Sequence, residues 1–253
     1  MNIENKTVLV TGSTDGVGRL VARQLADQGA RVLIHGRDRT RGEQLLKEIR
    51  TAEHGSAAFL PADFSSLAEV RRLADTVRQE CDRLDILINN AGIGSGGSAG
   101  KRETSQDGHE LRFAVNYLAG FLLTKVLLPV VMLGKPARIV NVSSLGQHPI
   151  NFDDVMLTRG YSASRAYAQS KLAQIMFTFD LARAGSRDGD GELPASGYLH
   201  GDDHGAAERR HAYQHRRGGS GSHSEPRCRG RTRRTFRPVL QRITALEGEP
   251  AGL

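Results

Sequence analysis

The stretch from Thr7 to Gly18, TVLVTGSTDGVG, decides the fold of this chain of 253 residues. Its first four residues form a short apolar run that predicts a buried strand. The three glycines that follow, Gly12, Gly16 and Gly18, predict a tight turn that opens an amphipathic helix ending near Gln28. Glycine is needed where a backbone turns tightly and approaches a pyrophosphate, whose charge then lies at the helix N-terminus. A plain strand–helix turn is the alternative interpretation.

Strands and helices alternate from this turn to about residue 182. Short apolar runs predict further strands at 31–35, 57–60, 85–88 and 138–142. Amphipathic or apolar segments predict helices at 41–49, 67–80, 109–131 and 161–182. This alternation is typical of a parallel, doubly wound sheet. We therefore predict an α/β fold with a Rossmann-type sheet, in a domain over residues 1–183.

The composition excludes several classes of protein. With 38% hydrophobic and 25% charged residues, the chain is neither collagen-like nor disordered throughout. Cys81 and Cys228 cannot form a disulfide framework, and the N-terminus has no signal-peptide pattern, so we expect a cytoplasmic protein. The longest apolar stretch, Tyr117–Leu133, contains Lys125 and Pro129 and falls short of the ~20 apolar residues of a membrane span.

The second predicted strand ends in His35-Gly36-Arg37, where a dinucleotide site ordinarily has an acid that binds the ribose 2′-hydroxyl. The expected acid position is Gly36, and Arg37 stands beside it. A guanidinium suits a 2′-phosphate, so we favour NADP(H), with NAD(H) as the alternative. The other interpretation of Arg37 is a solvated residue that follows a strand.

Candidate reactive residues follow the later strands. Ser144 comes after the fifth predicted strand, and Tyr167 and Lys171 lie four apart on the helix beyond it, hence on one helix face. A free phenol has a pKa near 10, and a nearby ammonium favours the phenolate. An isolated pair of this kind is a common surface feature. Together with the glycines, Asn116 and Ser144, it predicts acid–base chemistry.

These residues resemble the short-chain dehydrogenase/reductase family over about residues 5–182, and are most similar to its retinol-dehydrogenase-like branch. The likeness to that branch is carried by PINFDD at 149–154 and AYAQSKLA at 166–173. The resemblance implies an enzyme that interconverts a carbonyl and an alcohol by hydride transfer from or to a nicotinamide cofactor.

The resemblance also implies a role for each matching residue. Tyr167 would be the general acid in reduction and the base in oxidation, and Lys171 would lower its pKa and bind the nicotinamide ribose. Ser144 would hydrogen-bond the substrate oxygen, Asn116 would support a water that leads protons to Lys171, and Asp63 would contact the adenine. The implied cofactor-binding residues are Gly12, Ser13, Thr14, Gly16, Val17, Gly18, Arg37, Asp63, Asn90, Ala91, Gly92, Tyr167 and Lys171.

Other expectations concern partners and a competing tyrosine. We expect a small-molecule substrate, with no specific nucleic acid, no membrane and no metal; the family often pairs into homodimers through two long helices. Tyr161 is a second candidate tyrosine, but residue 165 is Arg where a lysine is needed, so Tyr167 is favoured.

The amino-acid composition of the sequence changes after Arg183, so residues 184–253 are treated as a separate segment. No Lys occurs beyond Lys171, and between Leu199 and Phe236 no apolar run exceeds two residues. Such a segment cannot offset its ordering entropy, so we expect a disordered or poorly packed tail. The tail lacks a recognisable sixth strand, nicotinamide loop and substrate lid of the family.

An out-of-frame translation is our hypothesis for this tail. Codons for residues 192–197, ELPASG, can be chosen so that a one-base advance encodes NCLHPA, which resembles the family's missing loop. The rival hypothesis for function is therefore a catalytically impaired, cofactor-binding remnant with one exposed sheet edge.

Two further interpretations of the tail were weighed. His200 and His204, and His211 and His215, have the helical spacing of metal ligands, but no apolar periodicity supports a helix there. Residues 227–237 are rich in Arg and could attract nucleic acid, but they contain no recognition module.

Overall fold

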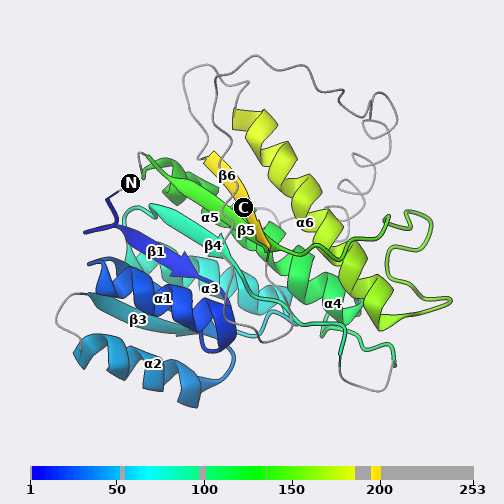
Figure 1. Ribbon diagram of the computed structural model, residues 1–253, viewed down its shortest axis with the longest axis horizontal. Coiled ribbons are helices and arrows are strands. Elements are labelled where there is room, and N and C mark those ends of the chain that lie inside the picture. The colour runs from blue at the N-terminus through cyan, green and yellow to red at the C-terminus, as the bar shows by residue number, and fades with distance from the viewer. Residues whose placement is uncertain (1, 52–54, 97–100, 135, 186–194, 201–253) are drawn as a thin grey trace, which may run out of the picture. The chain divides into compact units, whose positions relative to one another are not determined.

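The computed structural model describes residues 2–51, 55–96, 101–134, 136–185 and 195–200. It confirms the doubly wound α/β fold (Figure 1). All strand pairs are parallel, in the order β3-β2-β1-β4-β5-β6. The strands are Thr7–Val10 (β1), Arg31–Gly36 (β2), Ser56–Pro61 (β3), Ile86–Asn89 (β4), Arg138–Ser143 (β5) and Ala195–His200 (β6).

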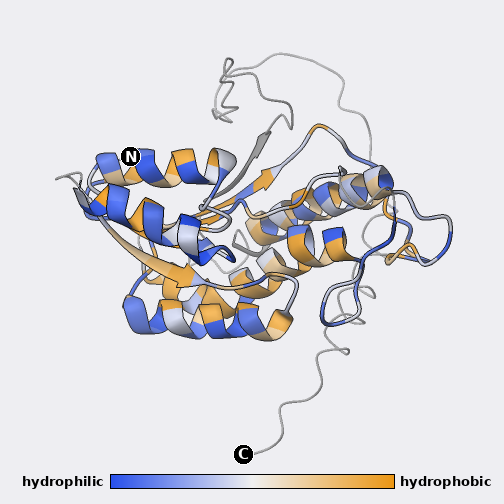
Figure 2. Cartoon of the chain, turned by 90° about the horizontal axis from the view of Figure 1, so that it is seen from below, coloured by the Kyte–Doolittle hydropathy of each residue, from blue (hydrophilic) through white to orange (hydrophobic). Residues whose placement is uncertain are grey.

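Helices cover both faces of the sheet because alternate strand residues point to opposite sides. Val8 and Val10 of β1 share an apolar cluster with Ala22 and Leu45, which belong to the helices of one face. Leu9, between them, belongs to a separate cluster with residues of the helices Leu67–Glu80 (α3) and Ala119–Met132 (α5). In Figure 2 the strands are largely orange, while the helices combine orange and blue residues as amphipathic helices do. The helices are Gly16–Asp27 (α1), Arg39–Thr51 (α2), Leu67–Glu80 (α3), Leu111–Phe113 (α4), Ala114–Leu118 (η2), Ala119–Met132 (α5) and Ala163–Gly185 (α6).

The helix predicted over 109–131 is not one regular helix. It begins at Leu111, after the side chain of Glu110 has accepted a hydrogen bond from the backbone N–H of Phe113. A π-helical turn, η2, then separates α4 from α5. Periodicity of apolar residues cannot reveal such a turn, because the side chains on either side remain buried. Single π turns are frequent at functional sites, and this one carries Asn116.

The expectation that no strand follows Arg183 is wrong. Residues 195–200 form β6, which pairs with β5 from Arg138↔Ala195 to Ser143↔His200. The sequence of β6, ASGYLH, has only two adjacent apolar residues, so it carries no alternating or continuous apolar pattern. Backbone pairing along the edge of β5 forms this strand, and that information is not local. The predicted boundary at 183/184 therefore falls before the last strand of the sheet.

The apolar segment that was expected to be too short for a membrane span is part of a longer helix. Leu111–Met132 is 22 residues long and contains an 18-residue window with a mean hydropathy of 1.7, which is enough to cross a membrane by length and composition alone. The buried core helix of a protein in water passes the same test, and 61% of this apolar window is buried.

The chain divides into two compact units, residues 1–150 with 156–206 and residues 151–155 with 207–253. Of the second unit, the described part is a turn in which the backbone N–H of Asp154 donates to the carbonyl of Asn151 over 3.2 Å. Apart from β6, the expectations about tail disorder, the second histidine pair and the Arg-rich segment fall outside the described residues. The out-of-frame hypothesis stays a prediction.

Candidate active site

The glycine turn packs against the turn that follows β4. Gly12 and Gly16 have φ angles of +63° and +53°, a region that favours glycine. A Cβ on Gly12 would lie 2.7 Å from Cα of Ala91, and one on Gly18 would collide with the Gly12 carbonyl and the Asn90 amide. Glycine is therefore required at Gly12 and Gly16 by the positive φ angle, and at Gly12 and Gly18 by the close contact with the second turn.

Asn90 fastens the two turns together. Its side-chain amide donates to the carbonyls of Thr11 (2.9 Å) and Gly12 (3.1 Å). The Thr11 hydroxyl accepts from the backbone N–H groups of Asn90 (2.9 Å) and Ala91 (3.0 Å). Asn90, a predicted cofactor-binding residue, thus uses its amide donors to fix the backbone of the glycine turn.

His35 is a site residue that the sequence analysis treated only as the end of a strand. Its Nδ1 accepts from the backbone N–H of Gly12 over 3.1 Å, and its Nε2 lies 3.2 Å from the Ala62 carbonyl. The ring stacks on Phe64 at a centroid distance of 4.2 Å. Burial lowers the pKa of His35 to about 4, so the ring is neutral at pH 7, with its proton on Nε2. A neutral imidazole thereby links the glycine turn to the loop after β3.

The remaining predicted residues of the turn and of β2 differ in their exposure. Ser13 is fully buried, and its hydroxyl accepts from the backbone N–H of His35 over 2.9 Å. Val17 is 58% exposed and Arg37 is also exposed. Thr14 lies against Gly36, where a Cβ would come within 2.5 Å of the threonine side chain. An acidic residue at position 36 would therefore collide with Thr14.

Asp63 lies in the loop after β3 with its geometry set by neighbours. Its Oδ1 accepts from the backbone N–H of Ser65 over 2.9 Å, and its own N–H donates to Oε2 of Glu69 over 2.6 Å. Glu69 belongs to the first turn of α3, which Ser66 caps. The predicted adenine-side carboxylate is thus oriented by a capped helix N-terminus.

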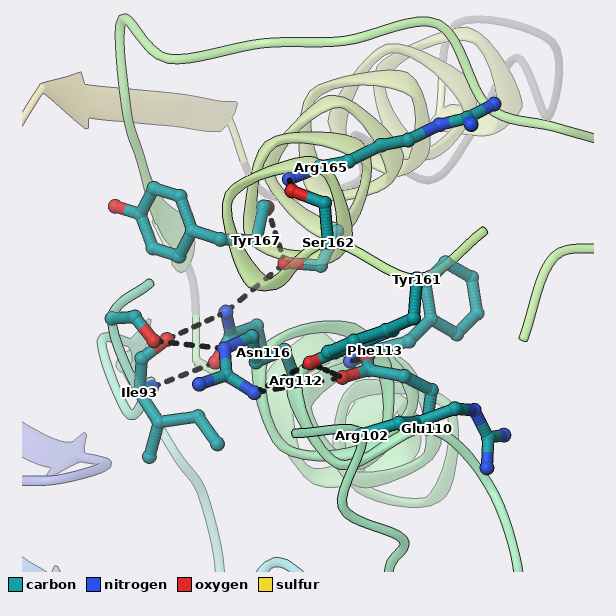
Figure 3. Close-up of polar contacts among 12 residues, drawn as sticks. Ile93, Arg102, Glu110, Arg112, Phe113, Asn116, Tyr161, Ser162, Arg165 and Tyr167 are labelled. Carbon is teal, nitrogen blue, oxygen red and sulfur yellow. Dashed lines mark hydrogen bonds and ion pairs between the residues drawn. The ribbon is translucent and has the colours of Figure 1, made fainter. Parts of the chain in front are cut away.

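Asn116 lies on η2 and reaches the loop after β4. Its Oδ1 accepts from the backbone N–H of Ile93 over 2.8 Å, and its Nδ2 donates to the Ile93 carbonyl (3.1 Å) and to the Ser170 hydroxyl (3.0 Å). Figure 3 shows this amide between Ile93 and the α6 helix. Asn116 is 1% exposed, so its role is fixed by these contacts.

Lys171 and Tyr167 lie one turn apart on α6, as predicted. The ammonium of Lys171 is 5.7 Å from the centroid of the Tyr167 ring and donates to the Val142 carbonyl over 3.1 Å. A Cβ on Gly92 would lie 3.6 Å from Nζ of Lys171 and 3.3 Å from Oδ1 of Asn116. The predicted Lys171, Asn116 and Gly92 therefore meet at one point.

Ser144 joins this group through the turn after β5. Its hydroxyl oxygen accepts from the backbone N–H of Gly146 over 3.2 Å. A Cβ on Gly146 would be 3.7 Å from that oxygen and 3.9 Å from Cε1 of Tyr167. Ser144 and Tyr167 thus flank the same glycine. The four predicted catalytic residues gather at the carboxyl ends of β4 and β5, where open α/β sheets bind ligands.

Tyr161 is not part of this group. It lies before the start of α6, and its hydroxyl contacts Arg112 (2.8 Å) and Glu110 (3.2 Å). The choice of Tyr167 over Tyr161 as the catalytic residue stays a prediction. Glu110 and Arg112 were not singled out from the sequence, because a buried ion pair next to an apolar helix has no local signature.

Comparison with known proteins identifies the family. The family model for short chain dehydrogenase matches residues 6–189. Human retinol dehydrogenase 13 is 41% identical over 187 residues, which cover 72% of this chain and 55% of that protein. Human retinol dehydrogenase 14 is 41% identical over 197 residues, covering 72% of this chain and 57% of that protein. The chain thus spans little more than half the length of these curated relatives.

Solved structures give the same result. An uncharacterized protein from Mycobacterium paratuberculosis is 35% identical with a TM-score of 0.67, covering 78% of this chain and 69% of that one. RhlG of Pseudomonas aeruginosa, 32% identical with a TM-score of 0.59, covers 72% of this chain and 67% of its own. The chain therefore belongs to the short chain dehydrogenase family, as its sequence resemblance predicted.

Proposed function

We propose that this chain is an NADP(H)-dependent oxidoreductase that interconverts a carbonyl and an alcohol by hydride transfer. The observation that carries the proposal is the buried ammonium of Lys171, 5.7 Å from the centroid of the Tyr167 ring, at the sheet edge that also bears the glycine turn. A cation there favours the phenolate form of the tyrosine, which a free phenol with a pKa near 10 seldom reaches at neutral pH.

Tyr167 and Ser144 perform the proton chemistry in this proposal. In reduction the Tyr167 phenol donates its proton to the carbonyl oxygen, and in oxidation the phenolate takes the proton of the alcohol. The Ser144 hydroxyl, on the other side of Gly146, donates a hydrogen bond to the same oxygen. The nicotinamide cofactor supplies or accepts the hydride when bound.

The residues of the first βα turn fit a dinucleotide. Gly12 and Gly18 leave the backbone bare, and α1 offers its N-terminus to a pyrophosphate. Arg37 is exposed just beyond Gly36, where no acid is present, which suits a 2′-phosphate. RhlG and a metagenomic short-chain oxidoreductase were solved with NADP, while the NADH-dependent reductase A1-R′ was solved with NAD.

Lys171 and Asn116 have supporting roles. Lys171 is 5% exposed, and its position near Gly92 suits an interaction with the nicotinamide ribose. Asn116 fixes the backbone of Ile93 beside that point, and in this proposal it supports a water that leads protons to Lys171.

The rival hypothesis, an impaired cofactor-binding remnant, rests on a missing substrate lid and missing last strands, which would leave the edge of β5 exposed. That edge is paired with β6 along six residue pairs. This pairing argues against the loss of a sixth strand, while the expected place of the substrate lid lies outside the described residues.

The test is turnover of NADPH with a panel of carbonyl compounds that begins with retinal, the aldehyde related to the alcohol in the relatives' names. We expect turnover that the change Tyr167→Phe abolishes, with NADPH binding retained in a fluorescence titration. Binding without turnover in the unchanged chain would support the remnant instead.

Arg37→Ala tests the choice of cofactor in the same assay. Loss of the guanidinium should weaken NADPH binding about tenfold or more and leave NADH binding nearly unchanged, because a charge-assisted contact to phosphate contributes roughly 1.5–3 kcal/mol. Equal weakening of both nucleotides would contradict the assignment of Arg37.

A further inference from the structure

A buried ionic cluster lies beside the site but outside the residues assigned above. Arg112 and Glu110 are 2% and 0% exposed. The Arg112 guanidinium donates to the Tyr161 hydroxyl over 2.8 Å and lies 3.8 Å from Oε1 of Glu110. The Tyr161 hydroxyl in turn donates to the same Oε1 over 3.2 Å. Figure 3 shows the three side chains joined in this way, next to Asn116.

A buried ion pair is by itself weak evidence for a contribution to stability. Removing two ions from water is costly, and well-packed apolar residues of similar volume are often equally stabilising. Unlike apolar packing, the hydrogen bonds of such a cluster are directional, so they fix one relative orientation of the segments that they join. Its position in the fold therefore indicates what it does.

The cluster connects three segments that build the site. Arg112 lies one helical turn before Asn116, and its Nε donates to the Gly94 carbonyl over 3.0 Å. Gly94 follows Ile93, the residue that Asn116 binds through both backbone groups. Tyr161 stands six residues before Tyr167, at the entry to α6.

The protonation state of Tyr161 agrees with the hydrogen bonds of the cluster. Burial and the neighbouring Glu110 raise its pKa, against the opposing effect of Arg112. The phenol is therefore neutral, accepts from Arg112 and donates to Glu110. Glu110 is further fixed because its Oε2 accepts from the backbone N–H of Phe113 over 2.7 Å.

We propose that Glu110, Arg112 and Tyr161 form a positioning brace, which sets the entry angle of α6 and the loop after β4 so that Tyr167, Lys171 and Asn116 face the bound substrate and nicotinamide. In this proposal the brace acts through these residues and does not itself bind either ligand. The proposal rests on the proposed function, because Tyr167 must be the acid–base group for its position to matter.

Two variants test the brace in the full chain. Tyr161→Phe removes only the shared hydroxyl, and Tyr117→Phe is its matched control, because the buried Tyr117 hydroxyl on η2 has no hydrogen-bond partner within the described residues. The double variant E110Q/R112M removes both charges at once, which avoids leaving one of them buried alone.

A positioning role predicts a split between the kinetic constants. We expect kcat to fall about tenfold or more in Tyr161→Phe and in E110Q/R112M, because small displacements of reacting groups are costly. KM for the carbonyl and Kd for NADPH should stay within about twofold, and Tyr117→Phe should match the unchanged chain. Unchanged kcat in a folded Tyr161→Phe protein, or equal losses in both Phe variants, would overturn the brace.

A second readout separates the brace from the proposed function. If the unchanged chain turns over no carbonyl, the proposed function fails, and the brace is then judged by ultraviolet titration of tyrosine. The Tyr167 signal is obtained by subtracting the matching Tyr167→Phe titration. A brace predicts that E110Q/R112M raises the pKa of Tyr167 by about one unit, as Lys171 and the phenol move apart; an unchanged titration overturns it.

Discussion

At the scale of single residues, the neutral ring of His35 makes stability depend on pH. The pKa of His35 is about 4 in the folded chain, against 6.5 for an ordinary histidine. Below pH 6.5 the unfolded chain takes up a proton that the folded chain refuses, so stability falls as the pH drops toward 4. We expect His35 alone to cost about 2 kcal/mol between pH 7 and pH 5, measured by urea unfolding.

Glutamine is the matched replacement for His35. Its amide can accept from Gly12 and donate to the Ala62 carbonyl, the two contacts that the imidazole makes, but it does not titrate. His35→Gln should therefore lose less stability than the unchanged chain over the same pH interval. An identical loss in both proteins would show that other groups cause the pH dependence.

Replacement of Tyr117 is predicted to increase the stability of the folded chain. Its hydroxyl is buried with no hydrogen-bond partner in the described part of the chain, while its ring packs against Phe113, Phe121 and Phe177. Tyr117→Phe keeps the ring contacts and removes an unsatisfied polar group. We expect a gain of about 1 kcal/mol in unfolding free energy. A lower midpoint of thermal unfolding would mean that the hydroxyl has a partner.

The residues of the site differ in how far sequence could predict them. Tyr167 and Lys171 follow from helical spacing, because contacts four residues apart are local. His35 could not be assigned, since its partner Gly12 lies 23 residues away and its role comes from burial. Ser13 and Asn90 are predicted to bind the cofactor, and this stays a prediction. Their side chains also bind protein backbone, which spacing alone does not reveal.

At the scale of elements, two glycines of the glycine turn allow the cost of backbone strain to be measured apart from the cost of a steric clash. Gly16 has φ +53° with nothing within 4 Å of its missing Cβ among the described residues, so Gly16→Ala should cost only about 1 kcal/mol of backbone strain. Gly12→Ala adds a collision with Ala91 to similar strain and should cost roughly 3 kcal/mol.

Denaturant unfolding of both alanine variants measures this difference. Because the Gly12 collision displaces the turn, NADPH binding should also weaken in Gly12→Ala. Equal destabilisation by the two substitutions would show that the turn after β4 gives way at no cost.

Prediction of whole elements succeeded where the pattern was local. The first strand and α3 match their predicted bounds. The strand is a continuous apolar run that ends at the glycine turn, and α3 has a helical apolar period that begins at a cap. The π turn η2 and the strand β6 were missed. Both are imposed by neighbours: η2 by the helices and loop around Asn116, and β6 by the open edge of β5.

At the scale of the whole molecule, β6 closes the sheet at the edge beside α6. A parallel edge strand directs the N–H groups of alternate residues toward its neighbour and the others away from it. Proline removes an N–H, so it is tolerated at one set of positions and disruptive at the other. Proline substitutions can therefore test the backbone pairing of β6.

Two double-proline variants form the matched pair for this test, Ser196→Pro/Tyr198→Pro and Gly197→Pro/Leu199→Pro. Their positions pair with Ile139 and Asn141 and with Val140 and Val142, respectively. One variant removes two bonds of the β5–β6 ladder and should lose roughly 3 kcal/mol or more of unfolding free energy; the other should lose much less. If both unfold like the unchanged chain, the ladder contributes nothing and the stable sheet ends at β5. A large difference between them would mean that β6 pairs with β5 and that the edge of β5 is covered by the protein's own backbone.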